Sequence, residues 1–444
     1  MRIPIFLSVL AFFTSTPCVA QETAEPGLDL ASITSLLAEA VDLPGPKARL
    51  SAARALAKRK DIALEGWEQA AQAFPPRGFP DGLKRRVLPG ERMFEVEIPL
   101  TVLGETERTR LALFVPESYS PSRPHGLLVY LHGAGGNGAQ MLNGMDAWAR
   151  SLDLLILAPS DAGPNAGYSG RPREKAAVLE ALRWMRRTYN VDENRVFLAG
   201  YSRGGHLTWD LVLRHPDLFA AAVPRAGAPR YVIAEGKNNL RYAQHLAHLP
   251  IRALIGEHEV NGIHLSATET LRRIQAAGNQ NAELIIEPGV GHGVHTQRIP
   301  WKSFLDTAKR TARPDRVVRL FARPGEGRAF WLEVLKEQKG VKEEFSIRAP
   351  RGASGDIPAE TVFQWVLEQG DDHTARAEAQ WEEGGRITLQ TKKVKKVRLR
   401  LSRDMLDEQG AVRVVWNGRT KKKKPKLSKL VLLSEFVERF DRSF

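Results

Sequence analysis

Short apolar runs alternate with amphipathic stretches between about residues 92 and 310, and this alternation is the clearest pattern in the chain. The runs are rich in leucine, valine, isoleucine and alanine, which is typical of strands buried on both faces. They lie at 127–131, 154–157, 196–199, 220–223, 251–255 and 284–286, with helix-like stretches such as 174–189 and 268–277 between them. Two earlier strand-like segments, 93–98 and 111–115, alternate and indicate an antiparallel pair. The pattern predicts an α/β domain at 91–312, a mostly parallel sheet covered by helices on both faces.

The patterns on either side of this region differ from it. Apolar residues follow helical spacing at 26–75, and we expect a helical N-terminal segment at 21–90. From Pro314 onward the chain alternates with a period of two, which predicts a β-rich accessory domain at 313–444. In that domain Asn417-Gly418 is a hairpin turn signal.

The first twenty residues resemble a secretory signal peptide. Arg2 precedes an apolar run at 3–13, and small residues lead to Ala20. A run of about 11 apolar residues is too short to span a bilayer, so no transmembrane anchor is expected in the mature form. We predict cleavage near Ala20 and export to the periplasm or beyond; the alternative is a buried N-terminal strand. Cys18, the only cysteine, would be removed, which excludes a cysteine nucleophile.

Charge is concentrated near the C-terminus. The chain has a formal net charge of +14, and residues 391–430 hold 15 lysines and arginines against three acids. Two segments in this part are rich in lysine: one runs from Lys392 to Lys396, and the other from Lys421 to Lys429. They would suit an anionic polysaccharide or envelope surface, whereas lysines on strands also mark a solvated face or a protected edge. No nucleic-acid partner is expected.

The strongest chemical signal is a G-x-S-x-G element. It places Ser202 between the strand-like run 195–199 and a helical stretch at 207–213. A sharp strand-to-helix turn with small flanking residues lifts a serine hydroxyl above the sheet edge. Ser202 is therefore the predicted nucleophile, which requires a base within hydrogen-bond reach.

The base and the acid are expected to follow in the order serine, acid, histidine. His292 lies in a glycine-flanked loop after the late strand 284–286 and is the predicted base, with His295 as the other candidate. Glu259 comes three residues after the glycine that ends the strand 251–255 and is the predicted acid, with Glu257 as its rival. The acid would orient the histidine and stabilise its protonated form.

A glycine-rich loop after the strand 127–131 offers backbone amides for a developing oxyanion. The amide of Ala134 or Gly135 would act together with that of Arg203, directly after the nucleophile. The pattern for a nucleotide-binding loop is absent, as is H-E-x-x-H, so we expect neither a cofactor nor a metal.

Taken together, the loop 132–135, the elbow 196–205, the segment 256–259 and Gly291-His292 resemble the α/β-hydrolase superfamily. The approach to the elbow, 189–202, is similar to the secreted esterase branch, which includes polyhydroxybutyrate depolymerase-like and feruloyl-esterase-like enzymes, with dienelactone-hydrolase and prolyl-oligopeptidase relatives. The resemblance covers about 92–310 and implies Ser202, His292 and Glu259 as the triad and Ala134 and Arg203 as oxyanion amides. Glu259 departs from the aspartate that most of these relatives have.

Three functions compete on this sequence. The first is a serine hydrolase that cleaves small or polymeric carboxylic esters. The second is a peptidase of the same fold, although the segment before residue 90 is too short for the propeller that such peptidases usually carry. The third is a non-catalytic protein whose basic C-terminal domain binds an envelope polymer.

Overall fold

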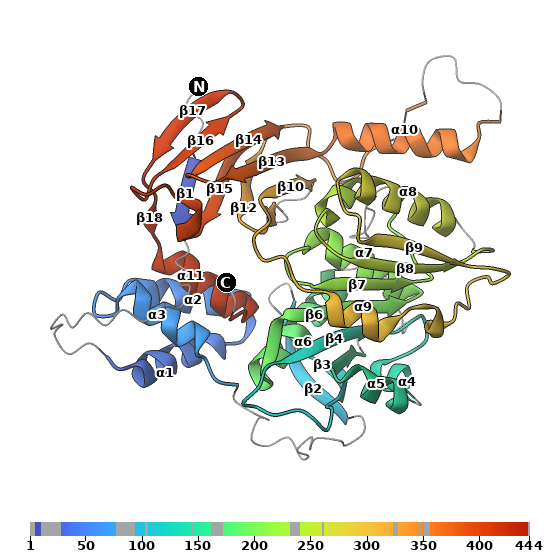
Figure 1. Ribbon diagram of the computed structural model, residues 1–444, viewed down its shortest axis with the longest axis horizontal. Coiled ribbons are helices and arrows are strands. Elements are labelled where there is room, and N and C mark those ends of the chain that lie inside the picture. Colours follow the sequence, from blue (N-terminus) through green and yellow to red (C-terminus); the bar gives the residue numbers. More distant parts are fainter. Residues whose placement is uncertain are drawn as a thin grey trace.

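The centre of the computed structural model is an eight-stranded sheet in the order β2-β3-β5-β4-β6-β7-β8-β9 (Figure 1). Strand β2 pairs antiparallel with β3, and β3 antiparallel with β5, whereas the pairs from β5 to β9 are all parallel. The strands are β2 (Phe94–Val102), β3 (Glu105–Phe114), β4 (His125–Leu131), β5 (Leu155–Pro159), β6 (Val191–Tyr201), β7 (Ala221–Arg225), β8 (Ile251–Gly256) and β9 (Ala282–Glu287). The structure describes residues 5–9, 28–76, 94–102, 105–143, 145–160, 172–230, 240–259, 262–322, 327–346, 348–349 and 356–442.

Both faces of this sheet are covered. Alternate residues of β4 enter two different cores: Leu127 and Val129 pack in one, and Leu128 and Tyr130 in the other. The first core also contains residues of α6 (Pro172–Thr188), α7 (Arg203–Arg214), η2 (Leu240–Leu246) and α8 (Ile263–Ala276). The second contains residues of α4 (Gly138–Leu142), α5 (Asp146–Leu152) and α9 (Trp301–Thr307). The predicted parallel sheet with helices on both faces is confirmed.

The C-terminal region contains two five-stranded sheets that share one apolar core. One has the order β10-β13-β14-β16-β17 and the other β11-β12-β15-β1-β18. The strands are β1 (Ile5–Val9), β10 (Arg316–Phe321), β11 (Arg328–Ala329), β12 (Leu332–Glu337), β13 (Ala375–Glu382), β14 (Arg386–Lys392), β15 (Val394–Leu401), β16 (Val412–Trp416), β17 (Arg419–Lys423) and β18 (Lys426–Leu427). Asn417 and Gly418 join β16 to β17 with positive φ angles of 44° and 80°, so the predicted hairpin is confirmed.

Two helices lie in the region predicted to be β-rich. Helix α10 (Ala359–Asp372) packs against Leu240 of η2 through Phe363 and Leu367. Helix α11 (Lys429–Arg439) leaves the sheets and packs with the N-terminal helices α1 (Leu30–Val41), α2 (Gly45–Ala57) and α3 (Leu64–Gln72) (Figure 1). Its apolar face, Leu432, Leu433, Phe436 and Val437, is buried in their shared core. The helical unit is thus built from both ends of the chain.

The N-terminal segment differs from the predicted signal peptide in one respect. Ile5–Val9 forms strand β1, which pairs in parallel with β15 and β18. The other residues of 1–20, including the cleavage position near Ala20, lie outside the described residues. In this chain β1 completes the sheet between β15 and β18, and removal of 1–20 would take that strand away. No helix among the described residues is long and apolar enough to cross a membrane.

Candidate active site

Ser202 lies at the tight turn between β6 and α7, the elbow that the sequence predicts. Its backbone has φ 55° and ψ −116°, a conformation that residues with a Cβ rarely adopt. Glycine is required next to it because a Cβ on Gly204 would lie 2.4 Å from the carbonyl oxygen of Leu131, and a Cβ on Gly205 2.3 Å from that of Arg225. The helix therefore approaches the neighbouring strand ends closely and holds the serine at the carboxyl edge of the sheet.

A continuous hydrogen-bond chain connects three of the predicted residues. Ser202 Oγ lies 2.8 Å from His292 Nε2, and His292 Nδ1 lies 2.8 Å from Glu259 Oε1. The Glu259 side chain is fully buried, whereas the His292 ring is 42% exposed. With Nδ1 donating to the carboxylate, Nε2 is left to accept from the serine hydroxyl. The exposed face of His292 leaves room for a substrate beside the serine.

The second histidine of the same loop has a different partner. His295 Nδ1 lies 2.8 Å from Glu287 Oε1, and the His295 backbone amide donates to Glu287 Oε2 at 2.8 Å. Arg298 Nε adds a third hydrogen bond to the same carboxylate at 3.0 Å. Glu287 thus anchors the loop after β9, and His295 belongs to that anchor rather than to the chain of bonds at Ser202.

Glu257, the other candidate acid, has a different hydrogen-bond partner from Glu259. Its Oε2 accepts a hydrogen bond from the Gly289 amide at 2.8 Å, across the turns that follow β8 and β9. Of the two glutamates that the sequence offers as the acid, the structure brings Glu259 to His292 and Glu257 to the backbone of the neighbouring turn.

The predicted oxyanion loop lies against the elbow. A Cβ on Gly133 would stand 3.5 Å from Ser202 Cβ, so the loop that holds Ala134 and Gly135 adjoins Ser202. The Arg203 amide is the first of α7, at the positive end of the helix dipole. The structure therefore brings the backbone at Ala134, Gly135 and Arg203 to the same edge as Ser202.

Two supporting residues were not predicted. Tyr201 donates a hydrogen bond to the His292 carbonyl oxygen at 3.0 Å. Arg225 donates to Tyr130 and to Thr296, and its guanidinium lies 5.5 Å from the centre of the Tyr201 ring. Together they tie the strand ends to the loop that carries His292. Tyr201 precedes the nucleophile and could have been considered from the sequence, but no local pattern around Arg225 indicates its contacts.

From the sequence, the loops 161–173 and 230–248 are expected to shape the substrate cleft; of these loops, 161–171 and 231–239 lie outside the described residues. Within the described ranges, no group of three or more histidine, cysteine, aspartate or glutamate side chains could hold a metal ion.

Glycine at position 202 is expected to stabilise the fold relative to alanine. The positive φ of Ser202 strains any residue with a Cβ, and glycine relieves that strain. We expect Ser202→Gly to have a free energy of unfolding about 1 kcal/mol above that of Ser202→Ala, as measured by urea denaturation. A glycine variant less stable than the alanine variant would contradict strain at the elbow.

Glu287 is expected to make stability depend on pH in acid. Hydrogen bonds from the His295 amide, and then from the His295 and Arg298 side chains, lower the pKa of its carboxyl group to about 2. This pKa is lower than the value of about 4.3 for a glutamate in the unfolded chain. The ionised Glu287 carboxylate therefore adds fully to the free energy of unfolding above about pH 4.3, and this addition is lost as the pH falls toward 2. We expect the stability difference between wild type and Glu287→Gln to shrink over that interval. A difference independent of pH in denaturation curves would contradict the assignment.

Comparisons with known proteins found one family model, several curated relatives and several solved structures. The sequence profile of the prolyl oligopeptidase family matches residues 173–253. Feruloyl esterase C of Emericella nidulans is 31% identical over 123 residues, which cover 26% of this chain and 45% of the relative. Acetylxylan esterase of Coprinopsis cinerea is 26% identical over 132 residues, 27% of this chain and 35% of the relative. A ferulic acid esterase structure from Anaeromyces mucronatus has 17% identity and a TM-score of 0.37, over 52% of this chain and 96% of that chain.

The order of strands, the elbow after β6 and the positions of Glu259 after β8 and His292 after β9 identify the fold. The chain contains an α/β-hydrolase domain. The predicted resemblance to feruloyl-esterase-like members of this superfamily is confirmed. The alignment spans less than half the length of the curated relatives named above.

Proposed function

We propose that the hydrolase domain cleaves carboxylic esters through an acyl-enzyme on Ser202. The observation that carries this proposal is the unbroken hydrogen-bond chain from Ser202 through His292 to Glu259. A serine hydroxyl is a weak nucleophile until a base removes its proton, and this geometry provides that base and an orienting acid.

In the proposed reaction His292 Nε2 takes the hydroxyl proton as Ser202 Oγ attacks the ester carbonyl carbon. The negative charge on the carbonyl oxygen is stabilised by the amide of Ala134 or Gly135 together with that of Arg203. The ester C–O bond then breaks, and His292 gives its proton to the leaving alcohol. His292 then takes a proton from water, which attacks the acyl carbon; the bond from that carbon to Ser202 Oγ breaks, His292 returns the proton to Oγ, and the acid leaves.

Ester substrates are favoured over peptides by the curated relatives. Two curated relatives that match about a quarter of this chain are named feruloyl esterase and acetylxylan esterase. The prolyl oligopeptidase profile keeps a peptidase as the second candidate. Of the described residues before β2, 5–9 form strand β1 and 28–76 contain the helices α1 to α3, whereas the propeller usual in such peptidases is built from blades of four strands each.

The test is a substrate panel with the purified full chain. We expect turnover of p-nitrophenyl acetate, longer acyl p-nitrophenyl esters and methyl ferulate, and none of these by Ser202→Ala beyond the buffer rate. Proline and alanine p-nitroanilides serve as the peptidase arm. Turnover of the anilides without turnover of any ester would replace the ester proposal with the peptidase, and no turnover of either would contradict both.

We also propose that the chain is exported and acts at an anionic polymer surface. The N-terminal signal-like pattern supports export. After expression in a host that exports proteins, we expect the intact mass of a chain that begins at Gln21; a mass that includes residues 1–20 would contradict export.

The proposed contact with an anionic polymer is supported by edge strand β17. All five residues of this strand are exposed, including Lys421 and Lys423. Lys429, in contrast, donates to the carbonyl oxygens of Arg59 and Ile62 and stabilises the helical unit. The surface proposal therefore rests on β17.

A further inference from the structure

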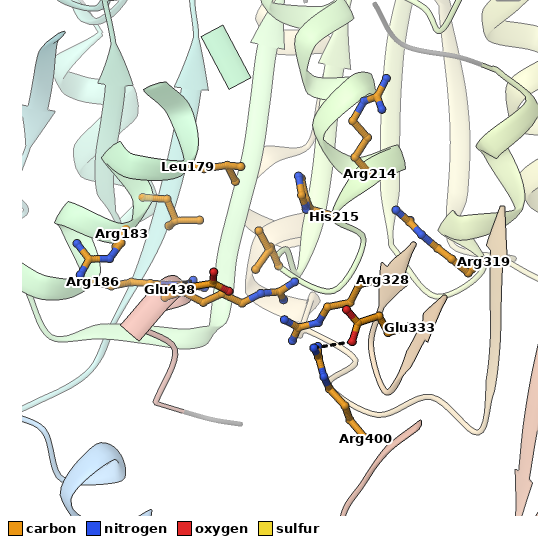
Figure 2. A pocket seen from close by; sticks show the side chains of 13 residues that line it. Leu179, Arg183, Arg186, Arg214, His215, Arg319, Arg328, Glu333, Arg400 and Glu438 are labelled. Carbon is orange, nitrogen blue, oxygen red and sulfur yellow. Dashed lines mark hydrogen bonds and ion pairs between the residues drawn. The ribbon is translucent and has the colours of Figure 1, made fainter. Parts of the chain in front are cut away.

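A cavity of about 330 Å³ lies where the hydrolase domain meets the C-terminal sheets and helix α11. The cavity wall includes Leu179 and Arg186 of helix α6, and His215, which directly follows helix α7 (Figure 2). Strands β11 and β15 contribute Arg328 and Arg400 from the other side. The volume is at the lower end of the range for small-molecule sites.

This cavity is separate from the catalytic centre. Ser202 precedes α7, and the cavity contacts Arg214 and His215 at the other end of the same helix. Twelve helical residues span about 18 Å at 1.5 Å per residue. A molecule in the cavity would therefore bind without touching the proposed triad.

The cavity is strongly cationic. Seven of its thirteen lining residues are arginine, and two are glutamate. The arginines come from several elements, and Figure 2 shows Arg186 on one side of the cavity and Arg328 and Arg400 together on another. This many arginines around one cavity are costly unless anions balance their charge, and Arg214, which points away from the cavity in Figure 2, pairs with Asp210 at 2.8 Å.

Carboxylates of the protein balance part of this charge. Arg400 contacts Glu333 at 2.8 Å and Glu435 at 3.0 Å, and Arg328 also pairs with Glu435. Likewise, Arg186 Nε lies 2.6 Å from Glu193 Oε2, and Arg439 lies 2.5 Å from Asp217. These pairs fix the guanidinium planes in the wall.

Other guanidinium nitrogens in the wall do not contact a carboxylate of the described residues in this way. Arg183 donates to the carbonyl oxygens of Val41 and Val437, which carry no full charge, and burial and then the nearby Arg49 lower its pKa to about 9. Among the described residues, Arg186 Nη2, Arg328 Nε and Arg400 Nε have no hydrogen-bond partner although they are buried. Buried donors of this kind are normally satisfied.

The positive charges of the arginines also affect His215, another residue of the cavity wall. Burial and the charges of Arg439, Arg319 and Arg214 lower the pKa of His215 to about 3, although Asp217 opposes the change. His215 is therefore neutral at neutral pH, where the arginines keep their charge. The cavity thus offers a permanent positive charge rather than one that titrates near neutrality.

We propose that this cavity binds a compact oxyanion with two or more negative charges, carried by a phosphoryl group or by several carboxylates. Guanidinium groups fixed in orientation form paired hydrogen bonds with such anions. Leu179, Leu182 and Leu218 line the cavity as well and suit a small carbon skeleton. Because the wall includes α6, four C-terminal strands and α11, the bound anion would hold the hydrolase domain, the sheets and the helical unit together.

The test measures thermal unfolding and calorimetric binding of the full chain with inorganic phosphate, with citrate and with chloride at equal ionic strength. We expect phosphate or citrate to raise the unfolding midpoint by about 2 °C or more over chloride. Phosphate binding alone would assign a phosphoryl ligand, and citrate binding alone a polycarboxylate. Neither anion exceeding chloride would overturn the proposal.

Three variants localise the binding. Arg400→Gln should weaken affinity about tenfold, the usual effect of losing a charged hydrogen-bond donor. Glu438→Gln removes a negative charge from the wall at constant shape and should not weaken binding, which keeps the test open if Arg400→Gln does not fold. Arg272→Gln, on the exposed face of α8, is the matched control and should bind as wild type. Equal anion response of Arg400→Gln and Arg272→Gln, or loss of response in Glu438→Gln, would place the anion elsewhere.

Discussion

Replacing His292 by alanine is expected to lower kcat for ester hydrolysis about 10⁴- to 10⁶-fold. The ring nitrogen Nε2 is 2.8 Å from Ser202 Oγ, and without it no base takes the hydroxyl proton. Because the ring is 42% exposed, its loss leaves no large buried cavity, and the unfolding midpoint should change little. Steady-state kinetics with p-nitrophenyl acetate and a thermal melt measure the two effects.

The control is His295→Ala, three residues later in the same loop. His295 also bonds a glutamate through Nδ1, but that glutamate is Glu287. We expect its replacement to lower kcat less than about tenfold, through the loop anchor alone. Similar losses in the two variants would contradict the assignment of His292 as the base.

Replacing Glu259 by glutamine is expected to lower kcat about 10³- to 10⁴-fold. The amide matches the carboxylate in shape but presents no negative charge to the protonated histidine, and it permits the wrong tautomer of His292. The Glu259 side chain is fully buried, so the isosteric change avoids a packing defect. KM should change far less than kcat because Glu259 acts through His292 and not on the substrate.

Glu257→Gln is the matched control for this variant. Glu257 accepts from the Gly289 amide, a bond that the glutamine oxygen can also accept. We expect near wild-type kcat. A larger loss in Glu257→Gln than in Glu259→Gln would transfer the role of the acid to Glu257.

The α/β domain was predictable because its signals are local. Buried-strand runs, helices between them and the glycines around Ser202 are each read within a few residues, and the order of the elements then fixes where Glu259 and His292 emerge. The choice between His292 and His295 depended on which carboxylate each ring meets, and Glu287 lies at the end of β9, where the sequence pattern gives no sign of this role.

The features that the sequence did not predict depend on contacts between distant segments. Helix α11 follows a lysine-rich strand, and its apolar face is matched by α1 to α3, about 360 to 400 residues earlier. Strand β1, which the sequence offers only as the alternative to a signal peptide, lies between β15 and β18 at a similar separation. The arginine cavity combines side chains such as Arg186 and Arg400 that are scattered along the chain. No periodicity within one segment encodes such an arrangement.

Covalent labelling is the sharpest test of Ser202 as the nucleophile and His292 as its base. The full chain is treated with a fluorophosphonate, digested, and the modified residue is located by mass spectrometry. We expect one phosphonylated position, Ser202, with labelling that is blocked by ester substrate and is strongly slowed in His292→Ala. Labelling of another serine in place of Ser202, or labelling that is equally fast in His292→Ala, would contradict the proposed nucleophile and its base.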